Sequence, residues 1–196
     1  MNKLTRDDLY SLEKYAEIRD DFRRKVMAHK ENRRLELGDH LLLLFEDKLI
    51  MQYQIQEMLK AERIFEAEGI QEELDAYNPL IPDGNNWKCT MMIQYPDVNT
   101  RRIMLGKLIG IEDKVWMQVE GHDKVHPIAD EDLERDTADK TSAVHFLRFE
   151  LTPEMIGDVK AGKAINAGVD HEQYQAELKP IPDKVRAALA EDLDCH

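Results

Sequence analysis

The sequence is poor in cysteine, glycine and proline, and it has no long apolar run. Its 196 residues include two cysteines, Cys89 and Cys195, nine glycines and seven prolines. Two cysteines and no Cys-x-x-Cys pair argue against a disulfide framework, and against zinc or iron–sulfur centres held by cysteine. The longest apolar run, 41–45, is far shorter than the roughly 20 residues that span a bilayer. Because the N-terminus also lacks an apolar signal core, we expect a cytoplasmic protein without a membrane segment.

Positive charge is also scarce. The chain has 27 Lys plus Arg against 40 Asp plus Glu, for a net charge of −13. This balance argues against broad nucleic-acid binding, which needs cations facing phosphate. The charge forms a gradient: residues 1–40 carry +1, residues 41–110 carry −4, and residues 111–196 carry −10. The acidic C-terminal half should therefore repel phosphate most strongly.

A local basic cluster stands against this trend near the N-terminus. It contains Arg23, Arg24, Lys25, Lys30, Arg33 and Arg34. One interpretation is a solvated helix end, where cations are favourable. The other is a site for an anion or an acidic partner, with Arg23, Arg24, Arg33 and Arg34 as its candidate residues.

The composition that is present supports a folded core. Hydrophobic residues make up 42% of the chain, and thirteen residues are aromatic (Phe 5, Trp 2, Tyr 6). A chain of this length forms one domain or two small ones. We predict a single domain over 1–196, with a soft boundary near 79–86, where proline, glycine and asparagine form a turn-rich loop.

Helical spacing dominates the first half of the chain. Apolar residues recur every three or four positions, and Asp47 can cap the second helix. The run 41–45 predicts a strand buried on both faces. The predicted helices are 6–30 (interrupted near Ser11), 48–65 and 68–77.

The second half changes to the period of strands. Alternation in 115–119 indicates a strand half exposed to water, followed by a hairpin loop at 121–123. The predicted strands are 87–95, 115–119, 124–128, 143–151 and 164–169. The predicted helices are 97–109 (Ile103, Leu105 and Leu108 inward), one that starts at Thr152-Pro153, and 182–193. The fold class is therefore α+β: N-terminal helices followed by a mainly antiparallel sheet with helices packed on it.

Histidines offer the first candidate site. The pair His122 and His126 lies across the predicted hairpin turn, and His145 lies on a nearby predicted strand. If these imidazoles converge, they can bind iron, zinc or manganese. The alternative is that they are ordinary loop and core histidines.

Polar residues on the predicted helix 48–65 offer a second candidate site. Glu62 continues the apolar stripe of this helix, so its carboxylate is expected to face the core. A carboxylate there must be paired, hydrogen-bonded or protonated. One interpretation is a structural network, and the other is a pocket that holds a ligand or metal. The candidate residues are Glu46, Gln54, Glu57, Glu62, Arg63, Tyr77 and Asn78.

Several stretches together resemble a known family. They are 45–47, the glutamine-rich stretch 51–59 (Met-Gln-Tyr-Gln-Ile-Gln-Glu-Met-Leu), 62–63, 73–82 and 142–149. The chain resembles, over nearly its whole length, a bacterial domain of unknown function, DUF3501. The resemblance implies a cytosolic protein whose genes often neighbour those of rubrerythrin-like and iron–sulfur oxidoreductase proteins. It implies no reaction and no catalytic residue.

Three functions remain open at this point. The first is an accessory protein of a redox or peroxide-stress pathway that binds a partner, such as a rubrerythrin-like or iron–sulfur oxidoreductase protein. The second is an enzyme or metal-binding protein that uses the carboxylate and amide cluster or the histidines. The third is a purely structural interaction module. No nucleophile or nucleotide-binding motif supports a specific reaction, and the sequence leaves open whether the chain forms a homo-oligomer.

Overall fold

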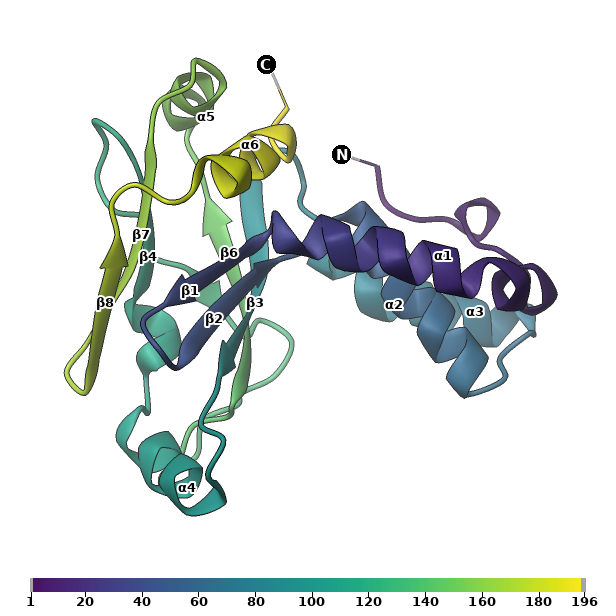
Figure 1. Cartoon of the computed structure of the whole chain (residues 1–196), viewed down its shortest axis with the longest axis horizontal. Coiled ribbons are helices and arrows are strands. Elements are labelled where there is room, and N and C mark those ends of the chain that lie inside the picture. Colours follow the sequence, from purple (N-terminus) through teal and green to yellow (C-terminus); the bar gives the residue numbers. More distant parts are fainter. Residues whose placement is uncertain (1, 195–196) are drawn as a thin grey trace.

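A computed structural model describes residues 2–194 and shows a helical arm that projects from a body of two sheets (Figure 1). The α+β prediction, with N-terminal helices and antiparallel sheets, is confirmed. The helices are α1 (Leu12–Glu31), α2 (Lys48–Ala61), α3 (Ala67–Tyr77), α4 (Val98–Lys107), α5 (Pro153–Lys160) and α6 (Asp183–Glu191). Short 3₁₀ turns are η1 (Arg6–Asp8), η2 (Asn78–Leu80) and η3 (Ile111–Lys114).

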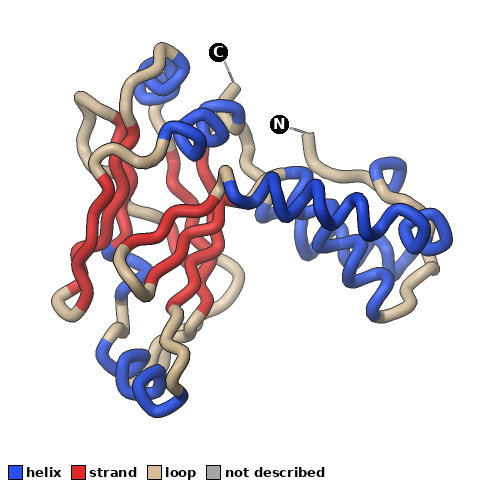
Figure 2. The backbone as a smooth tube through the Cα atoms, in the orientation of Figure 1, coloured by secondary structure: helices blue, strands red, loops and turns tan. Residues whose placement is uncertain are grey.

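The body contains two antiparallel sheets whose inner faces share one core (Figure 2). The first sheet has the strand order β1 (Arg34–Leu37), β2 (Leu41–Phe45), β3 (Asn86–Ile93), β6 (Val144–Glu150) and β5 (Ile128–Ala129). The second has the order β4 (Val115–Val119), β7 (Ile165–His171) and β8 (Tyr174–Leu178). The shared core joins alternate residues of both sheets and also takes in α6, where Trp87 donates to the carbonyl of Leu189 at 2.9 Å.

The arm has apolar clusters of its own. Helices α1, α2 and α3 pack on one another and bury residues such as Tyr15, Val26, Ile55 and Leu74. These two clusters are separate from the core of the sheets. The chain leaves the arm through η2, within the turn-rich segment expected near 79–86, and then enters β3. None of the helices in the described part of the chain is long and apolar enough to cross a membrane.

Helix starts follow the local capping chemistry. Ser11 accepts a hydrogen bond from the backbone N–H of Lys14 at 3.2 Å, so α1 begins after it rather than at residue 6. Asp47 caps α2 through the N–H of Ile50 at 3.0 Å, as expected. Helix α2 ends at Ala61, four residues earlier than predicted, because Arg63 turns the backbone into the left-handed region with φ of +53°.

Other details of the fold also differ from expectation. Ile103, expected to face inward on the helix, is 53% exposed. Trp116, on the face of 115–119 expected to meet water, is fully buried. The predicted strand 124–128 is reduced to one bridge between Val125 and Met117, and β5 begins only at Ile128. Strands β1 and β8 were not predicted.

Trp116 is buried because lysines and a glycine enclose its indole. Lys124 and Lys179 place their ammonium groups 4.2 Å and 5.6 Å from the ring centroid. On the paired strand β7, a Cβ added to Gly168 would lie 2.3 Å from the Trp116 ring. Strand β4 is therefore covered on both faces, although its sequence alternates.

We expect Gly168→Ala to destabilise the protein by about 1–3 kcal/mol, because the added methyl group overpacks the Trp116 contact. Gly157→Ala is the matched control: nothing lies within 4 Å of its added Cβ, and alanine favours helix α5 by about 0.5–1 kcal/mol. Urea unfolding of both variants measures the two effects. Equal stability of the two variants would contradict this account of the tight contact.

Candidate functional site

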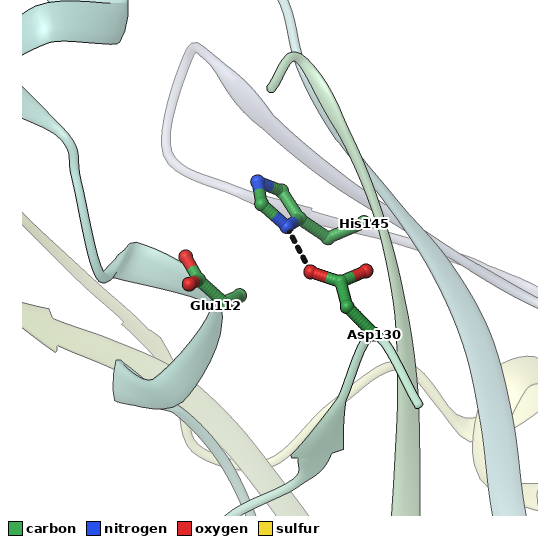
Figure 3. Close-up of side chains that lie close together, drawn as sticks. All are labelled: Glu112, Asp130 and His145. Atoms are coloured by element: carbon green, nitrogen blue, oxygen red, sulfur yellow. Dashed lines mark hydrogen bonds and ion pairs between the residues drawn. The ribbon is translucent and has the colours of Figure 1, made fainter. Parts of the chain in front are cut away.

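Three side chains of metal-ligand type, Glu112, Asp130 and His145, lie close together in the body (Figure 3). One oxygen or nitrogen atom of each lies within 4.8 Å of the others. Glu112 lies in η3, Asp130 directly follows β5, and His145 lies in β6. We call these residues the Glu–Asp–His cluster. They come from segments far apart in the sequence, so the fold alone brings them together.

His145 is fully buried and is held through both ring nitrogens. Its Nδ1 lies 2.5 Å from Oδ2 of Asp130. Its Nε2 lies 2.8 Å from the hydroxyl of Thr141 and 3.1 Å from the carbonyl of Ser142. Thr141 in turn donates its proton to Asp136. Both nitrogens therefore face acceptors, which fixes the ring and directs Nδ1 at the carboxylate.

Asp130 is positioned by backbone pairing at the end of β5. Its N–H donates to the carbonyl of Phe146 at 2.8 Å, and its Oδ1 accepts the N–H of Phe146 at 3.0 Å. Arg135 donates to the same Oδ1 at 3.0 Å. The residue has φ of +50°, in the left-handed region, a strained conformation that persists only where surrounding contacts enforce it.

Glu112 is the least satisfied member of the cluster. It is 9% exposed, and its Oε2 is buried with no hydrogen-bond partner among the described residues. Its pKa is raised to about 7, mainly by burial and also by the nearby Asp136 carboxylate, while a backbone hydrogen bond and the attraction of His145 oppose the rise. An unpaired buried carboxylate oxygen is costly, so a cation beside it would be stabilising.

The donor set suits a first-row divalent cation. One imidazole nitrogen and two carboxylates are ligands that manganese, iron and zinc accept. Metal–ligand distances of about 2.0–2.2 Å place neighbouring ligand atoms roughly 3 Å or more apart. The 2.5 Å contact between His145 and Asp130 must therefore open when a cation replaces the proton between them. Thr141 and Arg135 would then act as the outer hydrogen-bond partners that orient these ligands.

The three predicted histidines do not converge. His145 is in the cluster, but His122 pairs with Asp158 at 2.7 Å, and His126 is exposed. The single group of metal-ligand type found within the described residues contains neither His122 nor His126. The three histidines therefore do not form one site, and His145 alone belongs to the Glu–Asp–His cluster.

The polar residues of α2 and its neighbours mainly join the helices of the arm. Glu57 accepts two hydrogen bonds from Arg19, at 2.9 Å and 2.7 Å, and one from Tyr15 at 2.7 Å. The Arg19 hydrogen bonds lower the pKa of Glu57 to about 2, and the Tyr15 hydrogen bond adds to this. Asn78 pairs with both backbone groups of Leu4 at 2.9 Å. These contacts form a structural network, but it is centred on Glu57 and not on Glu62, the residue for which the network was expected.

Other members of this predicted set lie apart. Glu62 is exposed at the end of α2, so its expected burial on the core face is wrong, because the helix stops one residue before it. Arg63 is exposed in the following turn, and Gln54 is partly buried. Tyr77 is partly buried and lines a cavity that also contains Glu46.

Glu46 is the predicted site residue whose carboxylate is both buried and partly unpaired. It is 5% exposed, and its Oε1 accepts a hydrogen bond from Thr90 at 2.7 Å. Its Oε2 is buried with no hydrogen-bond partner in the described part of the chain. Burial raises its pKa to about 7. Glu46 lines the same cavity as Tyr77 and does not belong to the Glu–Asp–His cluster.

The basic cluster is divided by the fold. Arg23 and Arg24 are exposed on α1, and Arg24 pairs with Asp21. Arg34 lies within 3.5 Å of acidic neighbours on the surface. Arg33 is 1% exposed and binds carbonyls and carboxylates inside the protein, so its predicted place in a surface patch is wrong.

Glu112 and Asp130 were missed by sequence reasoning. Neither belongs to a short spaced motif, and both lie in the acidic second half, where carboxylates are common. A weak signal existed at Asp130, because it begins a stretch rich in acidic residues, 130–140, that follows the predicted strand ending at 128.

The chain is similar to a protein family and to a solved structure, both over nearly its whole length. The family model described as "Protein of unknown function (DUF3501)" matches residues 3–193. A crystal structure of a protein of unknown function from Burkholderia pseudomallei K96243 is similar, with 52% identity and a TM-score of 0.93, covering 98% of this chain and 100% of that one. None of the curated proteins is similar to this chain.

Proposed function

Because the chain belongs to the DUF3501 family, whose description assigns no function, we propose a function from the site itself: the protein binds one divalent transition-metal ion through Glu112, Asp130 and His145. The observation that carries this proposal is the buried, unpartnered Oε2 of Glu112 beside an Asp–His pair. Iron, manganese and zinc are the metals that fit the donor set.

The local charge balance supports a cation. Glu112 and Asp130 lie beside the single imidazole of His145, and a third carboxylate, that of Asp136, is linked to the ring through the Thr141 hydroxyl. Arg135 compensates Asp130 only in part, because it also pairs with Asp132 at 2.6 Å. A bound divalent ion would stabilise this excess of negative charge.

We expect protein purified without a tag to bind one equivalent of manganese, iron or zinc, measured by elemental analysis and by calorimetric titration. Glu112→Gln and His145→Gln should each lower the affinity by at least roughly tenfold, since even outer-sphere changes at metal sites cost about 10–100-fold. The absorption spectrum of a cobalt-loaded sample reports the ligand set directly, and it should change in both variants.

His122→Ala is the matched control for this experiment. His122 also forms a histidine–carboxylate pair, with Asp158, but it lies outside the Glu–Asp–His cluster. The metal affinity of His122→Ala should equal that of the unmodified protein. Failure of the unmodified protein to bind any of the three metals would overturn the proposal, as would unchanged affinity in Glu112→Gln. Urea unfolding confirms that each variant is folded.

An accessory role in a redox or peroxide-stress pathway is the second candidate. The charge gradient favours it, because the −10 of residues 111–196 offers an acidic surface to a basic partner. Rubrerythrin-like and iron–sulfur oxidoreductase proteins are the partner classes that the resemblance suggests. Co-purification at low and high salt tests this role: the partner should be captured at low salt only, and capture of neither class would count against it.

A further inference from the structure

A cavity of about 590 Å³ lies between the outer face of the first sheet and the end of the helical arm. Its sheet side includes Phe146 and Arg148 of β6 and Lys88 of β3. Its arm side includes Tyr77 of α3 and Leu80 of η2. This volume falls within the range of about 300–1,000 Å³ that is usual for small-molecule sites. The Glu–Asp–His cluster does not line it.

Glu46 lines this cavity and carries an unpaired polar atom. Glu46 is 5% exposed, and its Oε2 has no hydrogen-bond partner within the described residues. The two cations of the lining are already engaged. Lys88 donates to the carbonyl of Pro79 at 2.8 Å and pairs with Asp83, and Arg148 pairs with Glu131 at 2.6 Å.

The charged residues that line the cavity favour a ligand with a positive group over an anionic ligand. Its carboxylates are Glu46, Asp75, Glu131 and Asp132, and its cations are Lys88 and Arg148. Glu131 pairs with Arg148 and Asp132 pairs with Arg135, whereas Oε2 of the buried Glu46 has no partner among the described residues. Because the two cations are neutralised by their partners, an anionic ligand would find no free positive group. Tyr77, Leu80 and Phe146 offer apolar surface. The cavity therefore suits a molecule with an apolar body and one positive group.

We propose that this cavity binds a small organic amine, with its ammonium group on the carboxylate of Glu46 and its apolar body against Tyr77, Leu80 and Phe146. The proposal is independent of the metal site. It assigns to Glu46 a role that its contacts within the protein do not explain, because a buried carboxylate oxygen without a partner is unfavourable unless something pairs with it.

Binding should depend on pH because Glu46 must be ionised to pair with an ammonium group. Burial raises the pKa of Glu46 to about 7, and the cations near it, Lys30 and Arg33, act in the opposite direction. Asp47 adds repulsion, and the hydrogen bond from Thr90 favours the ionised form. The buried Cys89 thiol also lies near Glu46, and burial together with the Glu46 charge raises the pKa of that thiol. The other titratable residues that line the cavity with Glu46 are Asp75, Tyr77, Lys88, Glu131, Asp132 and Arg148. Affinity for an amine should therefore increase as the pH rises from 6 to 8.

Calorimetric titration with 2-phenylethylamine, 2-phenylethanol and 3-phenylpropanoate tests the proposal. The three probes share an aromatic body and differ in the charge of the head group. The amine should bind at least tenfold more tightly than the alcohol, and the carboxylate should bind least. Equal binding of amine and alcohol, preference for the carboxylate, or no binding of the amine up to millimolar concentration would each overturn the proposal.

Two variants locate the site. Glu46→Gln should lower the affinity for the amine at least tenfold and remove its dependence on pH. Glu72→Gln is the matched control, because Glu72 is an exposed carboxylate on the same helix α3 as Tyr77 and does not line the cavity. The affinity of this control variant for the amine should stay within twofold of that of the unmodified protein. Unchanged binding in Glu46→Gln would contradict the assignment, and metal content measured in the same sample separates this result from the metal proposal.

Discussion

Replacement of Arg33 by methionine is expected to destabilise the protein by about 3–5 kcal/mol, because removal of one partner from a buried ion pair leaves uncompensated charge. Arg33 is 1% exposed and lies between α1 and β1. Its Nε donates to the carbonyl of Phe45 at 2.9 Å, and its guanidinium also binds Asp192 of the C-terminal segment. The side chain thus ties the arm to the first sheet and to the C-terminal segment.

The two carboxylates near Arg33 explain the size of this effect. Asp192 is 3% exposed, and burial raises its pKa to about 6 although Arg33 opposes the rise. Asp47 lies 3.5 Å from the Arg33 guanidinium and also repels Asp192. Without Arg33, both carboxylates would lie in a poorly hydrated space with no cation between them. A lysine could not replace all of these contacts, because it lacks the planar fork of donors.

Urea unfolding at pH 7.5 measures the loss, and Arg34→Met is the matched control. Arg34 is the next residue, but it is partly exposed and only 3.5 Å contacts join it to acidic neighbours, so its loss should cost about 0.5 kcal/mol. The double variant Arg33→Met/Asp192→Leu should recover part of the stability, because it removes both charges together. A loss below 1 kcal/mol in Arg33→Met would contradict the role given to this side chain.

The elements with strong local signals could be predicted from the sequence. Strand 41–45 is an apolar run between polar turns, and it forms β2, where four of five residues are buried. Asp47 and Thr152 cap the helices that follow them, because a short acceptor side chain satisfies a free N–H of the first turn. These signals act within a few residues and need no knowledge of the rest of the chain.

Features that depend on distant partners could not be predicted. Trp116 is buried by Gly168 and by lysines from other segments. The alternating sequence of β4 does not indicate these contacts. The Glu–Asp–His cluster is assembled from η3, the end of β5 and β6, so no sequence spacing identifies it. The prediction that Glu62 faces the core is wrong for a local reason. Helical periodicity places residues on one face only while the helix continues, and α2 ends at Ala61.

Replacement of Glu46 by glutamine is expected to stabilise the protein at high pH by roughly 2–3 kcal/mol and to have little effect at pH 4. In the folded protein, burial raises the pKa of Glu46 from 4.5 to about 7. Below pH 4.5 the group is protonated in both states, so ionisation costs nothing. As the pH rises toward 7, the unfolded chain loses this proton first, and the folded state becomes progressively less stable. Above pH 7 the full cost of a buried charge is present.

Glutamine removes this cost because it cannot ionise, and its side-chain oxygen can still accept the hydrogen bond from Thr90. The free energy of unfolding of Glu46→Gln should therefore exceed that of the unmodified protein by an amount that grows between pH 4.5 and 7 and then levels off. Glu131→Gln is the control: its carboxylate is exposed, and hydrogen bonds from Arg148 lower its pKa. That variant should not gain stability with rising pH.

Urea unfolding of the three proteins at half-unit intervals from pH 4 to 8 gives the two difference curves. A pH-independent difference for Glu46→Gln would mean that the Glu46 carboxyl titrates alike in the folded and unfolded chain. The sign of the result also bears on the cavity. A carboxylate that destabilises the folded protein above pH 7 has no role in stabilising the fold at that pH, and an ammonium group placed on Glu46 should cancel the penalty. Repeating the pH 8 measurement with 2-phenylethylamine present should therefore raise the stability of the unmodified protein and leave that of Glu46→Gln unchanged.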